Sequence, residues 1–95
     1  MKSILEPKGC RICYVCGMEL YTEEHHIFYG TGNRKKSEKH GLKVHLCYGC
    51  HRAPKSGIHG GNRELDLRLK QTGQQAFEDL YGHELFMQEF GKNYL

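Results

Sequence analysis

The 95-residue sequence has no long apolar run. No stretch approaches the ~20 residues that a membrane-spanning helix needs, and the first residues, 1–7, have no apolar segment of the kind that opens a secretory signal. We therefore expect a cytoplasmic protein whose thiols meet a reducing environment. Internal repeats, low-complexity segments and linkers are also lacking, so residues 1–95 are expected to form one domain.

Apolar residues are scarce as well. Only 38% of the residues are hydrophobic and the mean hydropathy is −0.69, which indicates a thin core. Natural domains of this size often add a disulfide or a metal to become stable. The five cysteines are the obvious device for this, and in a reducing compartment paired cysteines favour metal over disulfide.

The charge is unevenly distributed along the chain. Residues 1–60 hold ten Lys and Arg against five Asp and Glu, whereas residues 61–95 hold four against six. The basic part also contains all the cysteines and six of the seven histidines. A positive surface around a metal site fits a polyanion such as DNA; the alternative is an ordinary solvated basic face.

The cysteine spacing predicts a structural zinc site. Cys13-x2-Cys16 and Cys47-x2-Cys50 are two tight turns that can direct four thiolates at one ion. Cys10 and Cys13 have the same spacing, but Gly17 follows Cys16, and a glycine there can take the positive φ of such a turn. Cys10 is then a spare thiol.

The histidine positions predict a second cluster. His25 and His26 follow the first cysteine pair and His51 follows the second, so an ion that joins the pairs brings these rings into one neighbourhood. On a regular strand His25 and His26 point to opposite faces, so a shared site requires the strand to end or bulge there. His40 and His83 are expected at the surface.

The apolar pattern predicts an α+β fold. Strands are expected over residues 24–29 and 42–46, separated by an exposed basic loop over 34–41 that can include a helical turn. A short helix should carry His51 and Arg52 and stop near Pro54. Asn62 should cap a long helix over 63–81 in which Gly73 marks a possible kink. Its apolar positions are Leu65, Leu69, Ala76, Phe77 and Leu80, and a last helix through Leu85, Phe86 and Phe90 should end at Gly91.

The combined motifs resemble a known family of nucleases. Cys-x2-Cys, His-His-Ile, Gly-Leu and Leu-Cys-x2-Cys-His follow one another over residues 13–51. This order is similar to that of the ββα-metal (HNH) endonucleases, in particular their zinc-stapled phage-type members and the endonuclease VII group. His25 stands where the first motif of the family often has an aspartate, as in the histidine pair of colicin-type DNases.

This resemblance implies a small ββα-metal domain with a zinc-stapled core over residues 13–60 and a C-terminal helical extension over 61–95. The implied activity is hydrolysis of DNA, double-stranded or branched, by a phage or prophage enzyme, with Zn²⁺ as the structural metal. His26 would be the general base, and His25 and His51 would be catalytic residues that hold one Mg²⁺, Mn²⁺, Ni²⁺ or Zn²⁺. A homodimer would allow both strands to be cut. The residues expected to contact the DNA backbone are Tyr29, Arg34, Lys35, Lys36, Lys39 and Arg52.

The chain departs from the family at two positions. The middle asparagine that orients the base is absent from residues 42–44, and His45 or Asn33 is expected to replace it. The position of the third metal ligand is taken by Lys55, so His59, or less favourably Asn62, is expected to bind the ion instead.

Two other classes of protein fit part of the pattern. A non-catalytic zinc-ribbon module would bind nucleic acid through the same basic residues without cutting it. A redox or zinc-storage protein would use only the cysteines, and its activity would respond to thiol oxidation.

Overall fold

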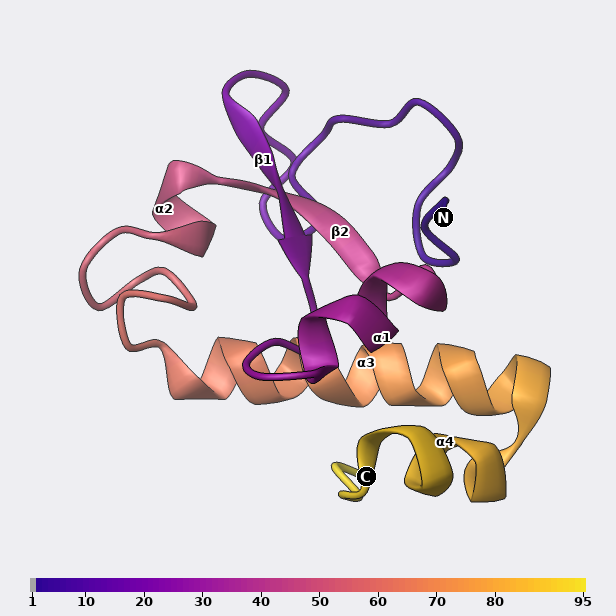
Figure 1. The fold of residues 1–95 in the computed structure, drawn as a ribbon. Coiled ribbons are helices and arrows are strands. Elements are labelled where there is room, and N and C mark those ends of the chain that lie inside the picture. The colour runs from indigo at the N-terminus through magenta and orange to yellow at the C-terminus, as the bar shows by residue number, and fades with distance from the viewer. Residues whose placement is uncertain (1) are drawn as a thin grey trace.

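The computed structural model describes residues 2–95 and forms a small α+β protein. Two strands form one antiparallel sheet; the two C-terminal helices lie below it, and a shorter helix lies at its lower end (Figure 1). Within residues 2–95, no helix has the length and apolar character to span a membrane. In chain order the elements are β1 (Thr22–His26), α1 (Asn33–Lys39), β2 (Lys43–Cys47), α2 (Tyr48–His51), α3 (Arg63–Tyr81) and α4 (His83–Phe90).

The sheet joins the first cysteine pair to the second. Thr22 pairs with Cys47 at one end of the sheet, and His26 pairs with Lys43 at the other. β1 lies two to three residues earlier than the predicted strand over 24–29, although the amide of Ile27 still donates to the carbonyl of Leu42 at 3.0 Å. His26 is therefore the last strand residue, and the chain can turn away from the sheet directly after it.

The basic segment after β1 forms helix α1 over Asn33–Lys39, which is more helix than the predicted loop with a helical turn. Ser37 explains much of the difference, because its side chain is fully buried. Its hydroxyl accepts the amide hydrogen of Phe28 at 3.2 Å and donates to the carbonyl of Leu42. This one side chain ties the helix to the end of β1 and the start of β2. Lys36 and Lys39 lie in the last helical turn, where they complement the helix dipole.

α2 is short, and the segment after it folds back on it. The helix ends at His51, with Arg52 as its C-cap, so it stops before the predicted end near Pro54. The amides of Ile58 and His59 donate to the carbonyls of Cys50 and His51 at 2.9 and 2.8 Å. These two bonds return the glycine-rich segment to α2 and bring His59 next to His51.

α3 has the predicted bounds and cap. The side chain of Asn62 accepts the amide hydrogen of Leu65 at 3.0 Å, which begins the helix. Gly73 causes no break in α3; a Cβ there would lie 3.3 Å from side-chain atoms of Ile27 and Phe28. The glycine therefore lets the helix approach the segment after β1. Leu80 was expected on the buried side but is 61% exposed.

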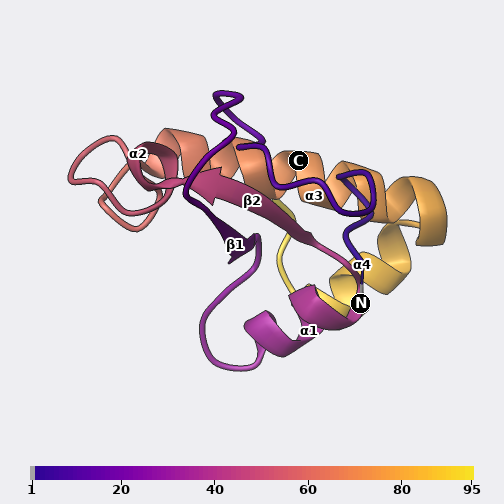
Figure 2. The same cartoon turned by 90° about the horizontal axis from the view of Figure 1, so that it is seen from above.

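α4 folds back under α3 and completes an aromatic core (Figures 1 and 2). The core rings are those of Phe28, Phe77, Phe86 and Phe90, with centroids 4.6 to 6.1 Å apart among the pairs in contact. Gly91 ends the helix in the left-handed conformation, as predicted. Of the three apolar residues predicted for this helix, Leu85 remains 36% exposed.

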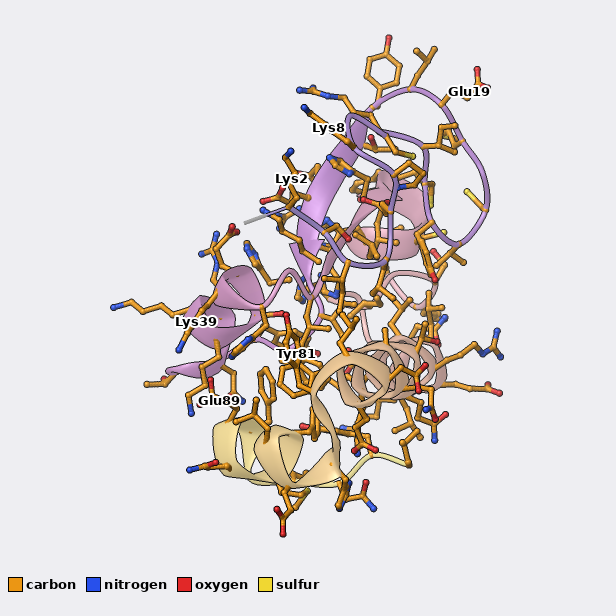
Figure 3. The ribbon with its side chains drawn as sticks, turned by 90° about the vertical axis from the view of Figure 1, so that its right-hand side faces the viewer. Lys2, Lys8, Glu19, Lys39, Tyr81 and Glu89 are labelled. Atoms are coloured by element: carbon orange, nitrogen blue, oxygen red, sulfur yellow. The ribbon has the colours of Figure 1, made fainter. Side chains whose placement is uncertain are left out.

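α1 also contacts α4 through polar groups. His40 Nε2 lies 2.5 Å from Glu89 Oε1, and Lys39 lies 3.7 Å from the same carboxylate (Figure 3). The ring of His40 packs against Phe77 at a centroid distance of 5.0 Å. The prediction that His40 is a surface residue was wrong, because its side chain is only 14% exposed. His83 is on the surface as predicted, with 56% exposure.

Candidate metal centres

The two cysteine pairs form one cluster. The sulfur atoms of Cys13, Cys16, Cys47 and Cys50 all lie within 4.8 Å of one another, and Cys16 Sγ lies 3.5 Å from Cys47 Sγ. Gly17 has a φ of 81°, the conformation that the first turn requires. Four convergent sulfurs can hold a metal ion and are compatible with structural zinc. Cys10 is a free, partly buried thiol outside this cluster.

Backbone amides prepare one of these thiols for a metal. Burial alone would raise the pKa of Cys13, but hydrogen bonds from the backbone of Cys16, Cys47 and Val15 lower its pKa to about 6. Burial and the neighbouring thiols raise the pKa of Cys50 instead. Without a cation the cluster therefore favours a mixture of thiolate and thiol, and a bound cation would favour the thiolates that ligate it.

Three histidines form a second cluster beside the first. His25 comes from β1, His51 from α2 and His59 from the returning segment, and a ring nitrogen of each lies within 4.8 Å of the other two. The ring centroids are 4.8 to 5.2 Å apart. His25 is 2% exposed, and its Nε2 is buried with no hydrogen-bond partner among residues 2–95. A buried ring nitrogen without a partner costs free energy unless a ligand pairs with it.

Burial keeps two rings of this cluster, those of His25 and His59, in the form that binds metals. Desolvation and then the nearby His51 and His59 lower the pKa of His25 to about 3. Desolvation and His51 also lower the pKa of His59. A neutral imidazole has a lone pair available for a cation, so these rings are ready to act as ligands near neutral pH.

A carboxylate orients the third member of the cluster. His51 Nδ1 lies 3.1 Å from Glu23 Oε1. The ion pair with Arg52 and the bond to His51 lower the pKa of Glu23, so the carboxylate is ionised and can only accept. Nδ1 then carries the hydrogen, and Nε2 of His51 is left for a cation. A divalent ion therefore fits the chemistry of the three imidazoles.

His26 lies outside this cluster, because adjacent strand residues point to opposite faces. Its Nε2 is 2.8 Å from Glu38 Oε1, and Lys43 Nζ is 2.8 Å from the other oxygen of Glu38. Lys43 and then His26 lower the pKa of Glu38 to about 2. His25 and His26 nevertheless both line one surface cavity of about 230 Å³.

Glu38 was not among the residues singled out from the sequence. A signal was present, since Glu38 is the only acidic residue between Glu24 and Glu64 and lies within a basic run. The two residues expected to replace the family's asparagine, His45 and Asn33, lie in different parts of the structure from each other. His45 pairs with Glu6 at 2.9 Å, and Asn33 begins α1.

Asn62, the alternative third ligand for the ion, makes hydrogen bonds to other groups. Asn62 caps α3 and donates to the carbonyl of Ser56 at 3.1 Å. His59 is the residue that reaches His25 and His51, whereas Lys55 is exposed. Of the two candidates for the third position, the structure brings His59 to the cluster.

The basic residues predicted to bind nucleic acid divide into two groups. Arg34 and Arg52 line the cavity that contains the histidines, and Arg52 also pairs with Glu23 at 2.8 Å. Lys36 donates to the carbonyl of Glu89, and Lys39 pairs with its carboxylate. Lys35 is exposed. The two arginines are therefore closer to the candidate chemistry than the lysines of α1.

No family model, no curated protein and no solved structure matches the chain. At the level that the geometry supports, this is a small α+β protein with a four-cysteine cluster that can hold a metal ion. Inferences about the function of the protein rest on the histidine cluster and on the His26–Glu38 pair.

Proposed function

We propose that the protein is a divalent-cation-dependent endonuclease of the ββα-metal (HNH) type that hydrolyses phosphodiester bonds of DNA. The observation that carries this proposal is the buried Nε2 of His25, which has no hydrogen-bond partner among the described residues and lies within a group of three imidazoles. His26, whose ring pairs with the carboxylate of Glu38, lines the same surface cavity as His25. A cluster of three possible metal ligands next to a histidine that pairs with a carboxylate supports hydrolysis better than it supports simple binding.

His25, His51 and His59 would hold the catalytic ion. An ion bound there would neutralise negative charge that builds on the phosphate and on the leaving 3′-oxygen. Imidazole ligands suit Zn²⁺ and Ni²⁺ better than Mg²⁺, which prefers oxygen ligands. We therefore expect Zn²⁺ or Ni²⁺ to support activity at lower concentrations than Mg²⁺.

His26 would act as the general base. Because Glu38 is ionised, its contact with Nε2 requires that nitrogen to carry the hydrogen. Nδ1 is then the nitrogen with a free lone pair, and it can accept a proton from the attacking water. Glu38 would also stabilise the imidazolium that forms, as a carboxylate does for the histidine of a serine protease.

Arg34 and Arg52 would bind the phosphate group. Both guanidinium groups line the cavity that contains the histidines, and a guanidinium can donate two parallel hydrogen bonds to phosphate oxygens. Arg52 is held in place by Glu23, which also orients His51. One carboxylate thus couples a metal ligand to a phosphate-binding group.

A plasmid-nicking assay tests the proposal. The wild-type protein should convert supercoiled to nicked plasmid when a divalent ion is added, and a chelator should stop the reaction. His26→Ala should reduce the rate roughly 100-fold or more, because general-base catalysis contributes about 10²–10⁴. His83→Ala is the matched control, since that histidine is exposed on α4 and pairs with Glu78, away from the cavity.

The main rival is a zinc-ribbon module that binds DNA without cutting it. Both functions require the cysteine cluster, so they differ only in turnover. A wild-type protein that binds DNA but nicks it with none of Mg²⁺, Mn²⁺, Ni²⁺ and Zn²⁺ would favour the module and refute the hydrolase. Because one site cuts one strand, cleavage of both strands would require two chains or two binding events.

A further inference from the structure

A larger cavity opens next to the histidine cluster. It has a volume of about 590 Å³, within the range of small-ligand sites. It lies between the N-terminal half of α3, the segment after α2 and the C-terminal residues 92–94. The proposed general base and the proposed phosphate-binding arginines do not need a cavity of this size.

The cavity and the histidine site share two side chains. Tyr29 and His59 line both cavities, and their ring centroids lie 5.1 Å apart. The ring of Tyr29 is also 5.9 Å from that of His25. A polymer with one phosphate at the histidine cluster would therefore have its neighbouring unit at the mouth of the larger cavity.

The lining combines aromatic rings with positive charge. Lys70 Nζ lies 4.5 Å from the ring centroid of Tyr29 and 5.7 Å from that of Tyr94, and Lys92 Nζ lies 5.3 Å from the Tyr94 ring. Arg63 adds a third cation. Among the described residues of the lining, Asp66 carries the one carboxylate, and it already accepts from Tyr29 at 2.9 Å and from Lys70 at 3.0 Å.

This composition fits a nucleotide. An aromatic ring offers a flat surface to any base, and stacking of bases on such rings tolerates all sequences. Lys70 is paired with Asp66, which leaves Lys92 and Arg63 as the two cations that can contact a negatively charged group such as a phosphate. Apolar side chains of Ile58 and Leu67 complete the lining. A paired base is held in the stack of a duplex, so a base in this cavity must be unpaired.

We propose that this cavity binds one unpaired nucleotide of the DNA strand, next to the phosphate at the histidine cluster. Tyr94 provides the stacking surface, and Lys92 and Arg63 contact the phosphate of that nucleotide. Tyr29 forms the wall between the two sites. The inference rests on the proposed nuclease function for its choice of DNA, and it makes DNA with an unpaired nucleotide the preferred substrate.

A binding measurement without added catalytic ion tests this. Fluorescence anisotropy compares a labelled duplex with the same duplex containing a one-nucleotide bulge, using the whole chain with no more than one equivalent of zinc, the amount that the cysteine cluster requires. The bulged DNA should bind roughly fivefold or more tightly, which is the lower end of what base stacking on an aromatic side chain contributes. Tyr94→Leu keeps an apolar contact with Phe28, whose ring lies 5.4 Å away, but removes the stacking ring, so it should abolish the preference.

Two further variants make the result specific. Tyr81→Leu removes a half-exposed tyrosine at the end of α3, outside the cavity, and should keep the full preference. Lys92→Gln should weaken binding of the bulged DNA more than Lys8→Gln, which removes an exposed lysine of the N-terminal segment. Equal affinity for the two DNAs, or equal behaviour of the two tyrosine variants, would overturn the proposal.

The outcome also separates this inference from the nuclease proposal. Plasmid nicking without any preference for the bulge would leave the hydrolase intact and remove the nucleotide site. A bulge preference that depends on Tyr94, in a protein that never cuts DNA, would establish the site and refute the hydrolase.

Discussion

Glu38 joins two strands through one carboxylate, because it contacts His26 on β1 and Lys43 on β2. Each contact favours the ionised form, which is why the pKa of Glu38 falls to about 2 from its ordinary value of 4.5. A depressed folded-state pKa means that the carboxylate stabilises the fold above its ordinary pKa. This contribution is lost as the pH falls from about 4.5 toward about 2.

Glu38→Gln should therefore lower the free energy of unfolding most at neutral pH. The loss should be about 1 kcal/mol or less, because exposed ion pairs are screened by water. Below pH 4.5 the gap between the variant and the wild type should narrow. Chemical denaturation of both proteins from pH 7 to pH 3 measures this. Glu19→Gln, on the exposed loop after the first cysteine pair, is the control (Figure 3). A gap that stays constant or widens in acid would show that Glu38 is not stabilised as its contacts indicate.

At the scale of elements, the close approach of α3 to the end of β1 depends on Gly73. A side chain there would meet Ile27 and Phe28, which both hold the helix against the sheet. Gly73→Val should destabilise the protein by about 1–3 kcal/mol, the usual cost of overpacking a core. Urea unfolding measures the change. The matched variant Gln75→Val places the same residue on the exposed side of α3 and should cost less than ~0.7 kcal/mol. Equal losses of stability in the two variants would mean that α3 is free to move away from Ile27 and Phe28.

The elements themselves were largely predictable, and the reasons differ along the chain. The bounds of α3 follow from local signals, the cap at Asn62 and the stop at Gly82. Helix α1 was predicted only as a loop with a helical turn because its stability depends on the buried Ser37, whose partners Phe28 and Leu42 lie in other segments. His40 was placed wrongly for the same reason, since its partner Glu89 is 49 residues away.

The candidate site likewise has parts that were predictable from the sequence and parts that depend on distant partners. The cysteine cluster and the convergence of His25 and His51 follow from spacing alone, because each histidine is adjacent to an element that the cysteines fix. The arrival of His59 depends on backbone bonds to α2 that no spacing rule predicts. The contact between His26 and Glu38 depends on helix α1, whose full length was not predicted. The catalytic roles of these histidines stay predictions until turnover is measured.

At the scale of the whole molecule, stability should depend on the cysteine cluster. A structural zinc supplies on the order of 10 kcal/mol of binding free energy, comparable to the entire stability of a typical domain. Cys47→Ser should therefore lose one equivalent of zinc per chain and lose cooperative thermal unfolding. Cys10→Ser removes a free thiol outside the cluster and should change neither property. Zinc content by colorimetric assay and melting by circular dichroism measure both. Full zinc retention in Cys47→Ser would exclude the four-cysteine site.

The sheet lies between two stabilising centres of different chemistry. The pairing of Thr22 with Cys47 places one end of it at the cysteine cluster, whereas Phe28, two residues past the other end, belongs to the aromatic core. His25 and His26 lie between these anchors. Oxidation of the thiols would disrupt the cysteine cluster, and heat would loosen the aromatic core. Either change would alter the positions of His25 and His26. The geometry of both rings should then depend on the cysteine cluster and on the aromatic core alike.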